Sequence, residues 1–391
     1  MIDVINHGCR LNIAEGEAIR TLAAPLGSAT IINSCAVTNE SVRQARQAAR
    51  GAFRTDPSRP VIVTGCAATS DAAAFAAMPE VARVVPVADK LAPATWGGTG
   101  PLNRKPVVSG LDHARAFVEV QTGCDHSCTF CIITHARGPN RSFAPADIVR
   151  AIAERVEAGC HEAVLTGVDT TSYEGGLGHL VRTILREVPT LSRLRLSSLD
   201  PAGIDPILFA LFAEEDRLMP HLHLSLQSGD DLILKRMKRR HSRAQAIALV
   251  AALKAERDIA VGADLIAGFP TESETAHANS LAILDECNVV HPHIFPFSPR
   301  TSTPAARMPQ LSHDIVRSRA AELRHAAETR RTVWLDDKVG QTATMLIERD
   351  GRSGHLPDFA SARLTMPVAP NTLLPVRLTG RDGTRLIAQP A

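Results

Sequence analysis

Aromatic side chains are scarce in this sequence. They make up 4% of its 391 residues, with a single tyrosine and two tryptophans. Proteins of the RNA-recognition-motif type bind single-stranded RNA by stacking its bases on exposed aromatic rings. The composition argues against a stacking platform of that kind.

Long apolar segments are missing as well. No stretch reaches the roughly 18 uninterrupted apolar residues that a membrane span needs. The first residues, Met1-Ile2-Asp3-Val4, lack the basic and apolar regions of a signal peptide. We therefore expect a cytoplasmic protein with no membrane contact. In a reducing compartment its eight cysteines are better candidates for metal ligands or small buried residues than for disulfides.

Neither sign of charge dominates, because 43 basic residues face 41 acidic ones and the net charge is +2. This balance neither favours nor excludes a nucleic-acid partner. Two local basic stretches, Lys235–His241 and Arg317–Arg331, could meet phosphates. A solvated helix face explains the second stretch equally well.

The chain is long enough for two or three domains and reads as α/β. Residues 1–95 alternate strands and helices, which predicts a small parallel sheet. Residues 92–110 have the composition of a linker. Strands are expected at 2–6, 29–33 and 60–64, and helices at 14–23, 41–53 and 71–77.

Residues 110–335 continue the alternation with about six βα units, which predicts a partial (β/α)6 barrel. Strands are expected at 116–121, 162–167, 193–198, 222–227, 260–267 and 291–297. Helices are expected at 145–158, 178–187, 203–213, 243–257, 274–287 and 312–335. Residues 336–391 have short runs of Val, Thr, Leu and Ile broken by Gly and Pro, and we expect a small β-barrel of about five strands there.

Three cysteines, Cys124, Cys128 and Cys131, directly follow the first strand of the predicted partial barrel. We call them the local triad. Three thiolates at this spacing can ligate three irons of a [4Fe–4S] cluster and leave the fourth iron open. An open iron can chelate S-adenosylmethionine (SAM), whose reductive cleavage gives a 5′-deoxyadenosyl radical. The alternative is a zinc site, for which His126 or His135 would have to supply the fourth ligand.

Other loops at the ends of the expected strands offer candidate SAM contacts. Glycines there would let the backbone approach the cofactor, and polar side chains could bind it. The candidates are Gly167, Gln227, Ser228, Asp264 and Gly268. Each is weak evidence by itself, because a glycine after a strand usually only makes a turn.

Cys9, Cys35 and Cys66 lie far apart in sequence, but each comes shortly after an expected strand of the first sheet. We call them the dispersed triad. Loops after neighbouring parallel strands share one edge of a sheet. The three thiols could therefore converge and hold a second [4Fe–4S] cluster. The alternative is three buried structural cysteines, which is how we interpret Cys160 and Cys287.

Along nearly its whole length the chain resembles the radical-SAM methylthiotransferases. The matching motifs are Gly8-Cys9-Arg-Leu-Asn12, Asn33-Ser-Cys35-Ala-Val-Thr38, Thr64-Gly65-Cys66, Gly123-Cys-x3-Cys-Thr-Phe-Cys-Ile-Ile, Ala136-Arg137-Gly138-x2-Arg141-Ser142 and His223-Leu-Ser-Leu-Gln-Ser-Gly229. The resemblance implies a radical-SAM core between an amino-terminal cluster domain and a TRAM-like β-barrel. Asp169 departs from the pattern, since a histidine is common there.

The resemblance also implies a division of labour between two clusters. The local triad would make the radical with SAM, and the dispersed triad would carry a sulfur that is methylated and transferred. The implied partners are tRNA, modified at position 37 of the anticodon loop, and an electron donor such as flavodoxin or ferredoxin. An unpaired base at that position can be reached without melting base pairs.

The substrate is expected to be N6-threonylcarbamoyladenosine. Enzymes of that type share motifs found here at Arg137–Ser142, Leu165–Val168 and Arg195–Pro201. Two alternatives keep the chemistry but change the substrate, to isopentenyladenosine 37 or to an aspartate of ribosomal protein S12. A third alternative is a non-catalytic metal-binding module that binds RNA.

Overall fold

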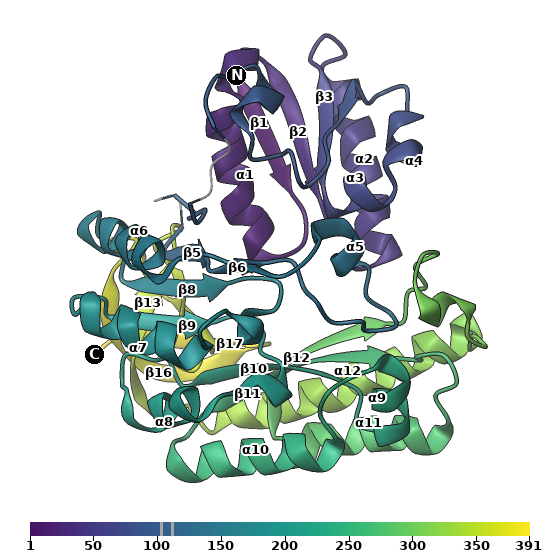
Figure 1. The fold of residues 1–391 in the computed structure, drawn as a ribbon. Coiled ribbons are helices and arrows are strands. Elements are labelled where there is room, and N and C mark those ends of the chain that lie inside the picture. The colour runs from purple at the N-terminus through teal and green to yellow at the C-terminus, as the bar shows by residue number, and fades with distance from the viewer. Residues whose placement is uncertain (102–104, 111–112) are drawn as a thin grey trace.

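The computed structural model describes residues 1–101, 105–110 and 113–391. Figure 1 shows the first sheet and its helices standing above a curved array of strands and helices, with the carboxyl-terminal strands packed behind that array.

The amino-terminal region is a four-stranded parallel sheet in the order β1-β2-β3-β4, flanked by helices. The two central strands are rich in β-branched residues and are buried throughout. Its strands are β1 (Ile2–Asn6), β2 (Ala29–Ser34), β3 (Val61–Gly65) and β4 (Arg83–Val84). Its helices are α1 (Arg10–Leu22), α2 (Asn39–Thr55), α3 (Cys66–Ser70) and α4 (Ala72–Ala76), with 3-10 turns η1 (Ala24–Leu26) and η2 (Pro93–Trp96).

The middle region contains six parallel strands in two three-stranded sheets, β5-β8-β9 and β10-β11-β12. Single bridges from Leu194 to Leu218 and from Leu199 to Leu224 join the two sheets. The strands are β5 (Arg115–Glu119), β8 (Glu162–Thr166), β9 (Arg193–Leu196), β10 (His221–Gln227), β11 (Ala260–Ala267) and β12 (Val289–Pro296). A short antiparallel pair, β6 (Gln121–Thr122) and β7 (Arg141–Ser142), follows β5.

Helices cover the outer face of these six strands (Figure 1). Leucine, isoleucine and valine side chains from strands and helices form the main hydrophobic core between them. The helices are α5 (Ile133–Arg137), α6 (Pro145–Glu157), α7 (Leu177–Glu187), α8 (Pro206–Glu214), α9 (Asp231–Met237), α10 (Arg243–Glu256), α11 (Glu274–Glu286) and α12 (His313–Asp336), with 3-10 turns η3 (Thr170–Ser172), η4 (Pro201–Gly203) and η5 (Pro304–Arg307).

The last region is a closed barrel in the order β13-β14-β15-β17-β16, with a small core of its own. Its strands are β13 (Thr342–Ile347), β14 (Ser353–His355), β15 (Ser361–Leu364), β16 (Leu373–Asp382) and β17 (Arg385–Pro390). It closes one end of the six-stranded array, because Arg195 donates to the carbonyl of Pro357 at 3.0 Å and Arg193 to that of Thr344 at 2.6 Å.

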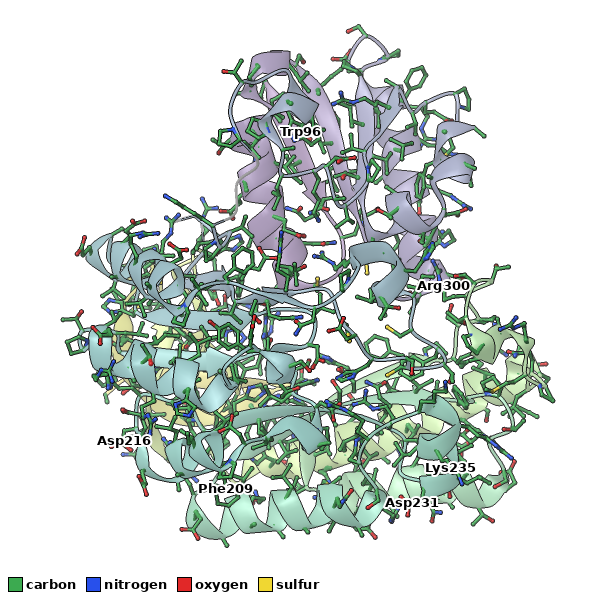
Figure 2. All side chains as sticks on the ribbon, viewed as in Figure 1. Trp96, Phe209, Asp216, Asp231, Lys235 and Arg300 are labelled. Atoms are coloured by element: carbon green, nitrogen blue, oxygen red, sulfur yellow. The ribbon has the colours of Figure 1, made fainter. Side chains whose placement is uncertain are left out.

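The amino-terminal region also contacts the strands below it. Arg300, in the loop after β12, lies near that region in Figure 2 and donates to Asn39 Oδ1 at 2.7 Å. Asn39 is the first residue of α2, and Thr38 caps that helix by accepting from the Ser41 amide at 3.1 Å. The start of α2 is therefore held next to the carboxyl end of β12.

The predicted fold class is confirmed: a small parallel sheet, a partial barrel of six strands and a closed five-stranded barrel. The sequence pattern did not predict β4, the β6–β7 pair, α3, α5 or α9, all of which are short. The proposed domain boundaries stay predictions, and residues 102–104 of the expected linker lie outside the described residues. In the described part of the chain no helix has both the length and the apolar character that crossing a membrane requires.

Candidate active site between the sheet and the partial barrel

The loop of the local triad begins at Gly123, whose backbone takes a φ of +74°. A Cβ at this position would lie 1.9 Å from the Pro139 carbonyl oxygen, so no other residue fits without moving the chain. Gln121 fixes the loop from below, since its Nε2 donates to the Gly123 carbonyl at 2.6 Å. The loop is thus folded back over the end of β5 before the first cysteine.

Each sulfur of the local triad faces a nitrogen donor. Cys124 Sγ lies 3.4 Å from the His126 amide, Cys131 Sγ lies 3.4 Å from the Ile133 amide, and Cys128 Sγ lies 3.7 Å from Arg239 Nη1. Burial raises the pKa of Cys124 to about 12 and that of Cys131 to about 11. These thiols hold their protons at neutral pH unless a metal displaces them.

The cysteines of the dispersed triad come together at the carboxyl edge of the first sheet. Cys9 precedes α1, Cys35 follows β2, and Cys66 is the first residue of α3. A Cβ on Gly8 would lie 2.6 Å from Cys35 Sγ, so the two neighbouring loops touch. Burial raises the pKa of Cys9 and of Cys35, and a charge on Cys66 raises both further.

Arg137, in α5, connects the two cysteine sites. It lies six residues after Cys131, and its Nε donates to Cys66 Sγ at 3.2 Å. Its two terminal nitrogens bind Glu15, both at 2.9 Å, and one of them also binds Asn12 Oδ1 at 2.9 Å. Lys90 completes this buried network with a 2.6 Å ion pair to Glu15.

A cavity of about 1380 Å³ opens between the first sheet and the partial barrel. Cys9 and Cys35 line it from one side, and Gly167, His223, Asp264 and His293 line it from the barrel strands and their loops. Cys9 is exposed, but to this internal space. Asp264 Oδ1 lies 3.0 Å from His223 Nε2 and 3.1 Å from His293 Nδ1.

Residues 118–281 match the Radical SAM superfamily, and residues 2–86 match the Uncharacterized protein family UPF0004. The threonylcarbamoyladenosine tRNA methylthiotransferase MtaB of Rickettsia prowazekii (strain Madrid E) is 40% identical, over 97% of this chain and 94% of its own length. The chain belongs to the methylthiotransferase family of radical-SAM enzymes.

Other relatives carry the same class of name. The protein called MtaB from Bacillus subtilis (strain 168) is 33% identical over 77% of this chain and 74% of its own. The tRNA-2-methylthio-N(6)-dimethylallyladenosine synthase of Erythrobacter litoralis (strain HTCC2594) is 29% identical over 99% and 96%.

Among solved structures, the radical S-adenosylmethionine methyltransferase TsrM from Kitasatospora setae matches this methylthiotransferase with a TM-score of 0.55. The match has 15% identity and covers 76% of this chain and 68% of TsrM. At that identity the likeness shows a shared fold.

Family membership confirms the expected cofactors, SAM and two [4Fe–4S] clusters. In this structure the three sulfurs of each triad are spread too widely to ligate one zinc ion together. Zn–S bonds of about 2.3 Å place tetrahedral sulfurs about 3.8 Å apart. Among the described residues, neither triad brings its three sulfurs within 4.8 Å of one another. Wider spacing suits the larger iron–sulfur cube.

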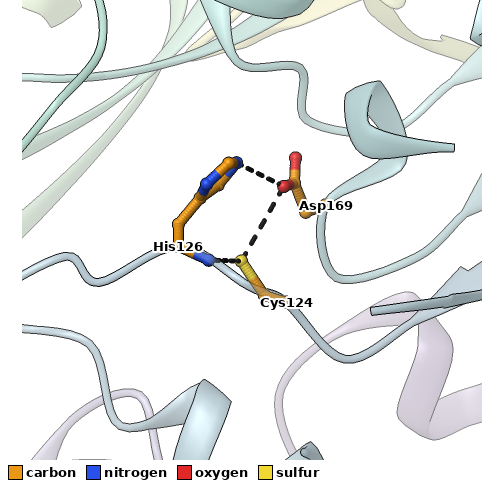
Figure 3. Close-up of side chains that lie close together, drawn as sticks. All are labelled: Cys124, His126 and Asp169. Atoms are coloured by element: carbon orange, nitrogen blue, oxygen red, sulfur yellow. Dashed lines mark hydrogen bonds and ion pairs between the residues drawn. The ribbon is translucent and has the colours of Figure 1, made fainter. Parts of the chain in front are cut away.

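His126, considered as a zinc ligand, lies beside Cys124, and ligand atoms of these two residues and of Asp169 are all within 4.8 Å of one another. Its Nε2 lies 2.8 Å from Asp169 Oδ2, and the same oxygen is 3.7 Å from Cys124 Sγ (Figure 3). Ser172 adds a 2.6 Å hydrogen bond to that carboxylate oxygen. The three side chains therefore form one hydrogen-bonded group beside the first cysteine of the local triad.

The candidate SAM contacts are dispersed over the strand ends. Gly167 and Asp264 line the cavity, whereas Gln227, Ser228 and Gly268 are not among the described residues that do. Gln227 has a φ of +66° at a β-bulge, and Gly268 has a φ of +71° beside Val316. Their role in binding SAM stays a prediction.

Sequence analysis missed several residues of the site. Arg137 and Asn12 stood inside family motifs, but nothing in their spacing showed that they would meet. Glu15 and Lys90 carried no signal, because a charged residue is usually solvated, and Arg239 stood only within the basic stretch Lys235–His241. In the His223–Asp264–His293 group, Asp264 was predicted as a candidate SAM contact and His223 stood inside a family motif, whereas His293 was not predicted.

Proposed function

We propose that this methylthiotransferase inserts a methylthio group at C2 of N6-threonylcarbamoyladenosine at position 37 of tRNA. The observation that carries the proposal is the cavity between the first sheet and the partial barrel, which is large enough for a modified nucleoside and reaches Cys9 and Cys35. The choice of substrate is supported by the names of the relatives, with 40% identity to a threonylcarbamoyladenosine enzyme against 29% to a dimethylallyladenosine enzyme.

In this proposal Cys124, Cys128 and Cys131 hold the cluster that binds SAM, and Cys9, Cys35 and Cys66 hold the cluster that supplies sulfur. Together with SAM these groups provide the radical that removes hydrogen from C2 and the methylated sulfur that replaces it. The cavity that Cys9 and Cys35 line also reaches Thr166, Gly167 and Val168 at the end of β8, the neighbour of the strand β5 that leads into the local triad. Arg137 fixes the two sites relative to each other, since it follows the local triad in sequence and binds Cys66 of the dispersed triad.

The RNA partner presents an unpaired base to this cavity. Position 37 lies in the anticodon loop, so the base can enter without disruption of a duplex. The electron donor is proposed to be a small redox protein such as flavodoxin or ferredoxin. The local triad supports this view, because its three cysteines are only half-buried.

The decisive experiment is mass spectrometry of tRNA nucleosides from a strain that lacks the gene. Loss of 2-methylthio-N6-threonylcarbamoyladenosine with accumulation of its unthiolated precursor is expected, and a plasmid copy should restore it. If only the isopentenyl analogue disappears, the substrate assignment is wrong while the chemistry stands. If no nucleoside changes and ribosomal protein S12 loses its methylthio group, tRNA is not the substrate.

A further inference from the structure

Arg10 lies immediately after Cys9, at the first position of α1, and lines the large cavity. Its side chain is half-buried. Within the described residues it has no hydrogen bond or ion pair, and its one specific contact is with the Phe359 ring, whose centroid lies 5.3 Å from its guanidinium carbon. This cation therefore has no directly paired carboxylate among the described residues, and only the charge of Glu162 lies near enough to raise its pKa.

The carboxylates nearest to Arg10 are already engaged. Arg115 and Arg195 also approach the Phe359 ring, at 5.3 and 4.8 Å. Glu162 pairs with Arg195 at 2.8 Å and with Arg193 at 3.7 Å, and Glu348 pairs with Arg115 at 3.0 Å. Three guanidinium groups therefore engage Glu162 and Glu348, and the neighbouring Asp358 pairs with Lys338, so none of these carboxylates pairs with Arg10.

A second arginine of the same cavity likewise has no hydrogen bond or ion pair among the described residues, and the charge near it is that of Glu328 on its own helix. Arg331, from α12, lines the space, and its Nε is buried without a hydrogen-bond acceptor. It lies close enough to His291 to lower the pKa of that ring, after the larger effect of burial. The His291 ring is 5.9 Å from Phe359, which places Arg331 toward the end of the cavity where Arg10 lies.

The His223–Asp264–His293 group differs from Arg10 and Arg331, because its charged side chain has hydrogen-bond partners. Burial would raise the pKa of Asp264, but the hydrogen bonds from the two histidines hold it below its ordinary range, so this carboxylate stays ionised. One cavity therefore carries an ionised acid with its partners in one part and two unpartnered guanidinium groups in another. Burying a cation without an anion is costly, which indicates that an anionic ligand completes this end.

We propose that Arg10, assisted by Arg331, binds the carboxylate of the threonyl group of the substrate and so selects threonylcarbamoyladenosine. This inference rests on the proposed function. A guanidinium fork can bind a carboxylate through two parallel hydrogen bonds. An isopentenyl group is uncharged and would leave both arginines unpaired, so the same residues would reject the competing substrate.

The test uses three anticodon stem-loop RNAs that differ only at position 37. One carries threonylcarbamoyladenosine, one carries its threonyl methylamide, which lacks the negative charge, and one carries isopentenyladenosine. Fluorescence anisotropy with the full-length, anaerobically reconstituted protein gives the Kd of each RNA. The proteins are the wild type, Arg10→Met, Arg10→Lys and Arg331→Met. Arg317→Met is the matched control, because Arg317 lines the cavity but is exposed and lies 3.7 Å from Asp314.

The wild type is expected to bind the threonylcarbamoyl RNA about tenfold more tightly than the methylamide RNA, as a charge-assisted hydrogen bond allows. Arg10→Met should bring the two Kd values together, Arg10→Lys should keep part of the difference, and Arg317→Met should keep all of it. Iron content and the visible spectrum show whether each variant still holds its clusters. If Arg10→Met loses iron, Arg331→Met, far from every cysteine in sequence, decides the result with a smaller expected loss of discrimination.

Two results would overturn the inference. One is an Arg10→Met protein with intact clusters that still prefers the charged RNA to the methylamide. The other is an equal loss of affinity for all three RNAs, which would mean that Arg10 binds the RNA backbone. Failure of the proposed function looks different: the wild type itself would prefer the isopentenyl RNA or would leave the threonylcarbamoyl RNA unmodified when SAM and reductant are added.

Discussion

The two cysteine triads are built in opposite ways. The local triad lies within eight residues on one loop, and its geometry is set by short-range contacts such as those of Gly123 and Gln121. The dispersed triad needs three loops from three strands, and the parallel pairing of β1 with β2 and of β2 with β3 brings those loops to one edge.

The two triads therefore depend on the surrounding fold to different degrees. A loop motif can persist while the surrounding structure varies, whereas the dispersed triad exists only when the first sheet has formed. Arg137 ties the second triad to the first, because it extends the local loop and binds Cys66. The two cysteine sites are therefore separate centres that Arg137 links.

The largest effects are expected from replacing each triad by alanines. Without Cys124, Cys128 and Cys131, formation of 5′-deoxyadenosine from SAM should stop. Without Cys9, Cys35 and Cys66, SAM cleavage should continue while methylthio transfer stops, and each variant should hold about half of the wild-type iron. Liquid chromatography of reaction products and iron analysis measure both. Methylthio transfer by the second variant would refute the sulfur-carrying role.

The second largest effect is expected from replacing Arg137, which follows the local triad and binds Cys66 of the dispersed triad. Arg137→Met leaves Glu15 without its bidentate partner and Cys66 without a donor, and removal of one member of a buried ion pair costs about 3 kcal/mol or more. Denaturant unfolding of the reconstituted protein measures this loss. The exposed pair of Arg43 with Glu40 supplies the control, since Arg43→Met should leave stability nearly unchanged. An Arg137 variant as stable as that control would mean that the triads are independent.

A change confined to the local triad is expected from Asp169→Asn. Removal of a negative charge 3.7 Å from Cys124 Sγ should make the local cluster easier to reduce and leave the dispersed cluster unchanged. Redox titration followed by electron paramagnetic resonance resolves the two potentials. Glu174→Gln, an exposed change on the same loop, should shift neither. A shift of both potentials would show that the two centres are coupled electrostatically.

The smallest effect concerns acid stability at the end of the large cavity where His291 lies beside Phe359. Burial lowers the pKa of His291 from its ordinary 6.5 to about 3. The unfolded chain therefore binds a proton that the folded protein does not, and stability should fall by up to about 1.4 kcal/mol per pH unit from this group as the pH drops from 6.5 to 3. Denaturant unfolding at several pH values measures the slope.

His291→Gln removes the titrating ring and should flatten the slope in that window. The matched control, His325→Gln, changes an exposed histidine on α12 and should keep the wild-type slope. Equal slopes for His291→Gln and the wild type would assign the acid sensitivity to other groups. One such group is Glu162. Burial would raise its pKa, but Arg195 and its neighbours lower it to about 2. The stability that the ionised carboxylate contributes to the protein is therefore lost only as the pH falls from its ordinary pKa of 4.5 toward 2.

The alternation of short apolar strands with amphipathic helices was sufficient to predict the fold class. β11 begins and ends where the sequence pattern placed it, and the other five barrel strands were placed within two residues at each end. The short elements were missed because five or seven residues such as those of α5 and α9 show too little periodicity. Both are held by contacts with distant segments, as when Thr129 Oγ1 donates to the Arg236 carbonyl at 2.8 Å.

The sequence by itself determined the local triad and the position of each dispersed cysteine shortly after a strand. Cysteine spacing and strand position can both be predicted from the order of residues along the chain. Only the tertiary structure decided which charged groups meet these sulfurs and which are left without partners. Arg137 and Glu15 are 122 residues apart, and Arg10 reaches a ring at residue 359. The reason is physical: electrostatic pairing depends on distance in space and on burial, and neither quantity can be read from one strand or helix alone.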